Sequence, residues 1–117
     1  MTEKTYPEYY QQLQKLAGRL GKEIKEPFSA FAQLHGAALA DGALSRKVKE
    51  LMALAISVSG RCQGCIAYHV HDALRAGATR EEILETIGVS IFMGGGPSMV
   101  YGCGALKALD EFSGTES

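Results

Sequence analysis

The chain has 117 residues, of which 46% are hydrophobic, and its 12 basic and 13 acidic side chains give a formal net charge of −1. This size suits one globular domain over residues 1–117, which should bury roughly two-thirds of the surface that its unfolded chain exposes. Balanced charge without a Lys/Arg run disfavours a nucleic-acid partner. The apolar run Leu51 to Val58 is far shorter than the ~20 residues that span a bilayer, and residues 1–12 are too polar for a signal peptide. We therefore expect a cytoplasmic protein with no membrane segment.

Two amphipathic helices are predicted in the first 40 residues. Thr5 suits the N-cap of the first helix, and Pro7 falls in the first turn, where its missing amide donor costs nothing. This helix should end at Gly21, and a second helix should run from about Pro27 to the Asp41-Gly42 turn. The apolar stripe of the first helix is Tyr9, Leu13, Leu16 and Leu20, and that of the second is Phe28, Phe31 and Leu34.

The third and fourth helices hold the residues with chemical function. Ser45 suits the N-cap of the third helix, which should end at Gly60. Because this helix is apolar nearly all round from Leu51 onward, we expect it to be central and buried. The fourth helix should begin at the cysteine pair and end at Gly77, a residue type common at helix C-termini.

The last two helices are marked by clear boundary signals. Thr79 and Glu82 form a capping box for the fifth helix, which should stop at the glycines 94–96. No strand precedes this glycine triplet and no GK[ST] follows it, so we expect a tight turn and not a phosphate-binding loop. Pro97 suits the first turn of a sixth helix. Its inner side is predicted to be Val100, Cys103, Leu106, Leu109 and Phe112. No segment shows sustained period-two alternation, so the predicted fold class is all-α with about six helices.

The cysteine pair Cys62-Gln63-Gly64-Cys65 is followed four residues later by His69. At 100° per residue, Cys65 lies about 60° and His69 about 20° from Cys62 around the helix, so the three share one face, whereas His71 points to the opposite side. A thiol in the first turn faces unpaired backbone amides, which stabilise the thiolate. His69 is placed to accept or relay the thiol proton.

Three interpretations of this pair remain open from the residues alone. In a reducing compartment, a close cysteine pair is typical of redox catalysis or metal binding, and an odd total of three cysteines argues against a disulfide framework. A zinc site would use Cys62, Cys65 and His69, with Glu50 or an external group as fourth ligand, but no second CxxC completes it. Two buried, inert thiols are the third interpretation. Glu50, in the first turn of its helix, is equally explained as a solvated acid.

Several of these features occur together in one known family. Glu50 precedes Cys62 by twelve positions, the Cys62-x-x-Cys65-x-x-x-His69 pattern follows, and AGATREEI at 76–83 and FMGGGP at 92–97 complete the set. Over about residues 28–112 the chain resembles the carboxymuconolactone decarboxylase/AhpD-like family, specifically its thiol-active, peroxidase-type branch.

The resemblance implies an all-helical fold, assembly as a homotrimer or homohexamer, and no cofactor. In that branch Cys65 would attack a small-molecule peroxide, Cys62 would be its disulfide partner and the route to an external dithiol or thiol-protein reductant, and Glu50 and His69 would form a proton relay. Gly64 stands where the well-characterised alkylhydroperoxidase has a histidine. The lactone decarboxylase that named the family lacks the CxxC, so that reaction is disfavoured here. A metal-binding or assembly module is the other alternative.

The remaining candidate side chains are expected to be structural. His35 is interpreted as an interior or interface histidine, and His71 as a surface or subunit-contact residue. Cys103 has no nearby cysteine in the sequence and is expected to be a buried small hydrophobe. Tyr68 is more typical of packing than of a site.

Overall fold

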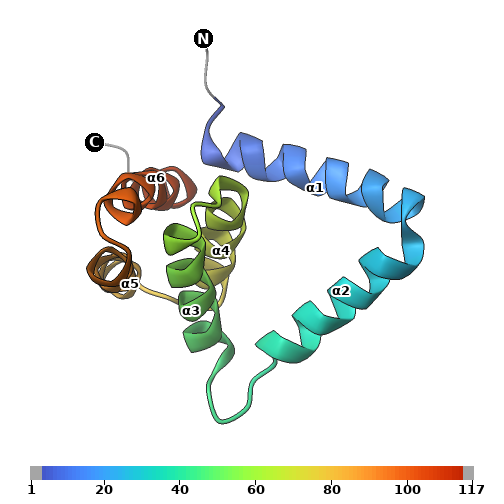
Figure 1. Ribbon diagram of the computed structural model, residues 1–117, viewed down its shortest axis with the longest axis horizontal. Coiled ribbons are helices and arrows are strands. Elements are labelled where there is room, and N and C mark those ends of the chain that lie inside the picture. The colour runs from blue at the N-terminus through green and yellow to red at the C-terminus, as the bar shows by residue number, and fades with distance from the viewer. Residues whose placement is uncertain (1–3, 115–117) are drawn as a thin grey trace.

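The computed structural model describes residues 4–114, and this range forms six α-helices without a β-strand (Figure 1). The predicted all-α class with six helices is therefore confirmed. The helices are α1 (Tyr6–Glu23), α2 (Lys25–Leu39), α3 (Arg46–Ser59), α4 (Gln63–Arg75), α5 (Arg80–Gly94) and α6 (Gly96–Ser113). None of them is both long enough and apolar enough to cross a membrane.

Three of the helices begin at the N-caps that the sequence predicts. The hydroxyls of Thr5 and Thr79 accept hydrogen bonds from the third amide of α1 and α5, and the glutamates Glu8 and Glu82 bond back to the cap amides. The Ser45 hydroxyl accepts from the amide of Val48 in the same way. Each cap satisfies amides that have no partner inside the helix, which fixes where the helix starts.

Helices α3 to α6 form the body of the molecule (Figure 1). α3 packs against α4 and α5, and α6 packs against α4 and α5. The largest fully buried apolar side chains of this core are Leu54, Val58, Ile66, Val70, Ile83 and Leu109. α3 and α4 are consecutive and joined only by residues 60–62, so the centre of the fold is a tight helical hairpin.

The body closes at a sharp corner between α5 and α6. Gly95 is the only residue between these helices, and its φ of 73° is a left-handed conformation that glycine adopts without strain. The buried Ser98 hydroxyl lies 3.4 Å from the Ser59 hydroxyl of α3. A Cβ at Gly94 would overlap the Ser98 side chain, so α5 and α6 approach closely only because position 94 has no side chain.

Helices α1 and α2 form an arm at one side of this body (Figure 1). The start of the arm is anchored, since Tyr6 is buried and its amide donates to Glu111 of α6 at 2.7 Å. α2 is different, because Leu39 is its only buried residue. The first helix is longer than predicted, because α1 continues past Gly21 to Glu23. Ile24 is both the C-cap of α1 and the N-cap of α2.

The predicted apolar faces are only partly covered within this chain. Phe31 and Leu34 of α2 are 69% and 61% exposed. α3 was expected to be buried all round, which is wrong, because Met52 and Ile56 lie on an open face. An amphipathic pattern shows that a face is apolar but does not show which chain covers it.

The predicted inner side of α6 is only partly right. Leu109 is buried and Phe112 packs against the core, as predicted, but Val100, Cys103 and Leu106 are exposed. The other buried residues of this helix are Ser98, Gly102, Ala105 and Ala108. The reason is steric. A Cβ on Gly102 would lie 3.0 Å from Ile87 Cγ2, so α6 turns its small residues toward the body to approach α5 closely.

Candidate redox site

The turn between α3 and α4 sets the position of the cysteine pair. α3 ends at Ser59, and Arg61 then adopts a left-handed conformation with φ of 56°, which is unusual for a residue with a side chain. The amide of Cys62 donates to the carbonyl of Ser57 at 3.1 Å, so the chain reverses direction while keeping its backbone groups bonded. As a result α4 starts directly beside the last turn of α3.

Cys62 and Cys65 are joined in a disulfide at the start of α4, with their Cα atoms 5.2 Å apart. Cys62 is the N-cap residue, and its Sγ accepts a hydrogen bond from the amide of Cys65 at 3.2 Å. Both cysteines are partly exposed. The sulfurs therefore lie at the positive end of the helix dipole and within reach of an external reagent, a setting that stabilises thiolate when the bond is reduced.

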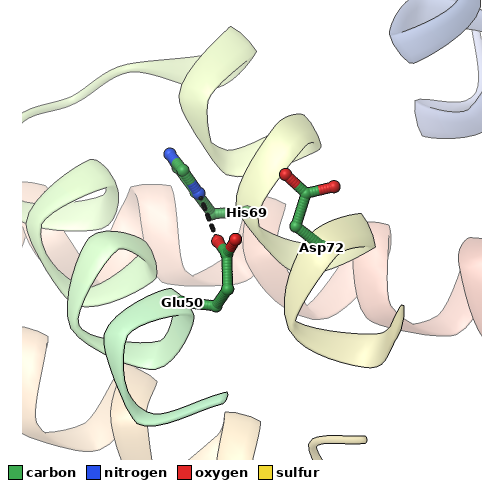
Figure 2. Close-up of side chains that lie close together, drawn as sticks. All are labelled: Glu50, His69 and Asp72. Carbon is green, nitrogen blue, oxygen red and sulfur yellow. Dashed lines mark hydrogen bonds and ion pairs between the residues drawn. The ribbon is translucent and has the colours of Figure 1, made fainter. Parts of the chain in front are cut away.

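Glu50 is fully buried and bonded on both carboxylate oxygens. Oε1 lies 2.9 Å from Nδ1 of His69, and Oε2 accepts from Nε of Arg46 at 3.1 Å. Figure 2 shows Glu50 from α3 and His69 from α4 pointing toward each other. The interpretation of Glu50 as a solvated acid is wrong, because its side chain has 0% exposure. A carboxylate buried this completely is costly unless it is paired, and both partners are present.

This contact defines what the histidine can do. When Glu50 accepts the Nδ1 proton of neutral His69, Nε2 is left without a proton and can take one. His69 is 20% exposed in its side chain, so part of the ring is open to solvent. Cys65 lies one turn earlier on the same face of α4. Among the hydrogen bonds of residues 4–114, none joins a cysteine sulfur to Glu50 or His69. The four predicted residues therefore form two separate pairs, the Cys62–Cys65 disulfide at the start of α4 and the Glu50–His69 contact between α3 and α4.

Two residues of the site were not singled out from the sequence. Arg46 pairs with Glu50 from one turn earlier on α3, and Asp72 follows His69 by three residues on α4. One oxygen of Asp72 lies within 4.8 Å of ligand atoms of both Glu50 and His69 (Figure 2). Spacings of three and four residues put side chains on one helix face, and this was the signal that could have found both.

The same group of side chains bears on the metal-binding alternative. Glu50, His69 and Asp72 each offer one ligand atom in this space. Arg46 already neutralises Glu50, however, and a neighbouring guanidinium disfavours a cation there. The zinc set with both cysteines is not available in this oxidised state, because the disulfide removes both thiolates.

Helix α1 covers the cysteine pair at Gly64. A Cβ on this glycine would lie 3.3 Å from Leu13 Cδ1 and 3.4 Å from the Tyr9 hydroxyl. A histidine here would therefore crowd Leu13 and Tyr9 of α1, and their side chains would have to shift. Beside this contact, an open apolar groove of about 440 Å³ runs between α1 and Tyr68. The groove is lined by Leu13, Leu16, Ala17, Leu20 and Tyr68.

Three other predicted placements are corrected by the structure. His71 is not a surface residue but is half-buried, with its ring stacked on Tyr10 at 4.2 Å between centroids. His35 is exposed on α2, so the interior placement is wrong, and the interface placement stays a prediction. Cys103 is exposed and not a buried hydrophobe, because α6 turns Gly102 and Ala105 inward instead.

The fold and the site together define an all-helical class of protein, with a partly exposed CxxC disulfide and a histidine held by a buried glutamate. Within this class, the chain belongs to the carboxymuconolactone decarboxylase family, whose match covers residues 25–108. The family expected from the sequence is thereby confirmed.

Relatives of known sequence or structure agree with this membership. An uncharacterized protein of Cupriavidus necator is 42% identical over 80% of this chain and 82% of its own length. The apo crystal structure of a carboxymuconolactone decarboxylase family protein from Legionella pneumophila is 40% identical, with a TM-score of 0.90 over 95% of this chain and 99% of that one. A Thermotoga maritima member, described with a suggested part in antioxidative response, is 27% identical with a TM-score of 0.77 over 92% and 97% of the two chains.

Proposed function

We propose that this protein is a thiol-dependent peroxidase with disulfide-reductase chemistry, in which Cys65 attacks a small-molecule peroxide. The observation that carries the proposal is the partly exposed Cys62–Cys65 disulfide at a helix N-terminus, one turn from a histidine held by a buried carboxylate. A cysteine pair that opens and closes there has a stabilised thiolate, an adjoining proton carrier and access for reagents.

The oxidative half of the reaction begins with the reduced pair. His69 takes the proton of the Cys65 thiol, and the thiolate attacks one oxygen of a hydroperoxide ROOH. The O–O bond breaks, Cys65 becomes a sulfenic acid, and the departing RO⁻ takes a proton from His69 and leaves as ROH. Cys62 then attacks the sulfenic sulfur as a thiolate, which forms the disulfide and releases hydroxide that is protonated to water. Two electrons pass from the two thiols to the peroxide.

The reductive half needs an external dithiol. One thiolate of that reductant attacks Cys62 Sγ and forms a mixed disulfide, and Cys65 leaves as a thiolate. The second thiol of the reductant displaces Cys62, so the reductant departs oxidised and both protein thiols are restored. A cytoplasmic setting is part of this proposal, because its thiol pool is reducing. The antioxidative role suggested for the Thermotoga maritima relative supports the same direction.

Peroxide consumption by two cysteine variants tests the proposal. With dithiothreitol as reductant, Cys65→Ser should abolish hydrogen peroxide turnover, because the thiol proposed to attack the peroxide is gone. Reduced Cys62→Ser from which dithiothreitol has been removed should complete one oxidation and accumulate a sulfenic acid that dimedone traps at residue 65. Cys103→Ser is the matched control, because it removes the exposed free thiol and should leave turnover unchanged.

Two results would overturn this function. One is peroxide turnover that survives in Cys65→Ser. The other is stoichiometric zinc held by the reduced protein through both cysteines, with thiols that fail to oxidise in mild peroxide, which would favour the metal-binding alternative. Lactone decarboxylation that persists without either cysteine would favour the reaction that named the family.

We also propose that a second copy of this chain covers the open apolar face. A compact monomer of 12.5 kDa exposes about 6,200 Å². This chain exposes 7538 Å², about 1,300 Å² more, and stable subunit interfaces bury upward of ~800 Å² per partner. The most exposed large apolar residues are Phe31, Leu34, Ile56, Val89, Phe92, Met93 and Val100. The excess area matches a shared interface, and a homotrimer or homohexamer is the expected assembly.

Sedimentation analysis over a range of concentrations tests this assembly. The unmodified chain should sediment as an oligomer, and Phe92→Glu should shift it toward the monomer, because a buried unpaired charge is costly at an interface. Lys22→Glu, a charge change on the exposed surface of α1, is the control. A monodisperse monomer at ~100 μM would contradict the proposal, since obligate interfaces remain assembled at that concentration.

A further inference from the structure

A carboxylate that sequence reasoning missed lies directly behind the proposed relay. Asp72 has an oxygen within 4.8 Å of both Glu50 and His69, and its side chain is only 22% exposed. The inference below rests on the proposed function, because it concerns the proton that His69 takes from Cys65. Nothing in the family match or in the relatives assigns a role to this residue.

The charges around His69 are uneven when its ring is neutral. The two carboxylates near the ring are the more buried charges, since Glu50 is 0% and Asp72 is 22% exposed in its side chain. The two guanidiniums near them, Arg46 and Arg75, are both exposed, so solvent screens their positive charges more strongly. The surroundings of a neutral His69 ring are therefore negative on balance. Asp72 therefore favours the protonated ring, which is the form produced when Cys65 gives up its proton.

Asp72 is nearer to the ring than to the thiol. It follows Cys65 by seven residues on α4, a rise of about 10 Å. Coulomb energy falls with distance and solvent screens the longer path, so the attraction for the His69 proton exceeds the repulsion of the Cys65 thiolate. The net effect is to make the transfer from Cys65 to His69 easier.

The orientation of Asp72 is fixed by His71, its neighbour on α4, which in turn packs against side chains of α1 and α6. Its Oδ1 lies 2.9 Å from Nδ1 of His71, whose ring stacks on Tyr10 of α1 and meets Phe112 of α6 edge-on. The charge of Asp72 is felt by the neighbouring phenols, since it adds to the desolvation that raises the pKa of Tyr10 and Tyr68. The carboxylate is thus held in place by residues that have no other chemical role in the site.

We propose that Asp72 is a positioning residue for the thiol–disulfide reaction, which holds the proton on His69 and so keeps Cys65 as a thiolate. The charged groups that face His69 are Arg46 and Glu50 from α3, with Asp72 and the more distant Arg75 from α4. Tyr10 from α1 and His71 act on Asp72 and not on the ring.

The pH dependence of Cys65 alkylation by iodoacetamide tests this role without any peroxide. The measurement uses the Cys62→Ser background, and mass spectrometry of the tryptic fragment 62–75 separates Cys65 from the exposed Cys103. Asp72→Asn should raise the pH of half-maximal alkylation rate by about one unit, the size expected for losing one charge at this range. Asp72→Glu should recover most of that shift. Asp110→Asn, which removes a carboxylate from a surface pair with Arg80, should leave the profile unchanged.

The outcomes separate this inference from the proposed function. A profile for Asp72→Asn within ~0.3 units of the parent would overturn the role of Asp72, since it is well below the shift a nearby charge produces. An equal shift in Asp110→Asn would do the same. If circular dichroism shows that Asp72→Asn does not fold, His71→Phe is the replacement variant. It keeps the ring contact with Tyr10 but removes the hydrogen bond to Asp72. The pH of half-maximal alkylation should then rise by less than in Asp72→Asn. Peroxide turnover that persists in Cys65→Ser would refute the peroxidase function, yet the alkylation profile would still decide the role of Asp72.

Discussion

Glu50→Gln is the substitution that most directly tests the site geometry. The buried carboxylate accepts from two donors, Nε of Arg46 at 3.1 Å and Nδ1 of His69 at 2.9 Å. A glutamine of the same shape has one acceptor oxygen and one amide donor. If its oxygen serves Arg46, its NH₂ group faces His69, and Nδ1 must then accept. The ring proton moves to Nε2, and the ring can no longer take the thiol proton there.

The expected loss follows from that change of tautomer. General-base catalysis by a positioned histidine is worth about 10²–10⁴-fold, so the rate of Cys65 oxidation should fall at least ~100-fold, or about 2.7 kcal/mol in barrier height. The stability cost should be smaller. Hydrogen bonds to a charged group contribute about 1.5–3 kcal/mol and neutral ones about 1 kcal/mol, so the variant should lose roughly 1–2 kcal/mol and still fold.

Rapid mixing of reduced protein with hydrogen peroxide in the Cys62→Ser background measures this rate, with dimedone trapping of the sulfenic acid as readout. Glu85→Gln removes an exposed carboxylate from α5 and serves as the matched control. A Glu50→Gln rate within about threefold of the parent would refute the reasoning, because a tautomer that blocks the proton acceptor cannot be so mild.

Three further predictions follow from local geometry. Gly94→Ala should destabilise the fold by about 1–3 kcal/mol in urea unfolding through overpacking against Ser98, and adding Ser98→Gly should recover part of that loss. The cap amide of Thr79 and the ion pair with Lys47 hold the pKa of Glu82 below its usual value, so Glu82 stabilises the fold above pH ~4.5 and loses this effect as pH falls through the folded pKa. Glu82→Gln should therefore flatten the acid limb of the stability curve, and an unchanged limb would contradict the cap. Gly64→His should displace α1 from the cysteines, which would appear as faster protease cleavage within residues 6–23 without any gain in peroxide rate.

The helices and the thiol site were predictable because their signals are local. Thr5, Ser45 and Thr79 mark helix starts through contacts three residues away, and the structure shows each cap. The Cys62, Cys65 and His69 spacing lies within one helix, so its shared face follows from helical geometry alone. The burial of Glu50 required a tertiary contact, and there the resemblance to a family supplied what periodicity could not.

The remaining errors share a physical cause. The spacing of apolar residues shows which face of a helix is apolar, but it does not show which surface packs against that face. The exposed stripe of Phe31 and Leu34 and the outward-facing Cys103 both depend on which surfaces meet, within this chain or between copies. Close helix contact at Gly102 favoured small residues over the larger apolar ones that pattern analysis weighs most heavily. Arg46 and Asp72 were missed because charged residues on a helix are usually solvated, and only packing brings them to the site.

The short separation of the two cysteines has a consequence for the free energy of the proposed redox cycle. Three positions separate Cys62 from Cys65, so the disulfide closes a very small ring. In the chain-entropy description, a loop of about four residues restricts the unfolded chain by only about 2 kcal/mol, against about 4.7 kcal/mol for a loop of ~100 residues. The oxidised and reduced proteins should therefore differ by only about 2 kcal/mol in unfolding free energy, less than the stability of a typical small domain. In the proposed cycle, the pair can then open and close while the helical hairpin that carries it stays folded.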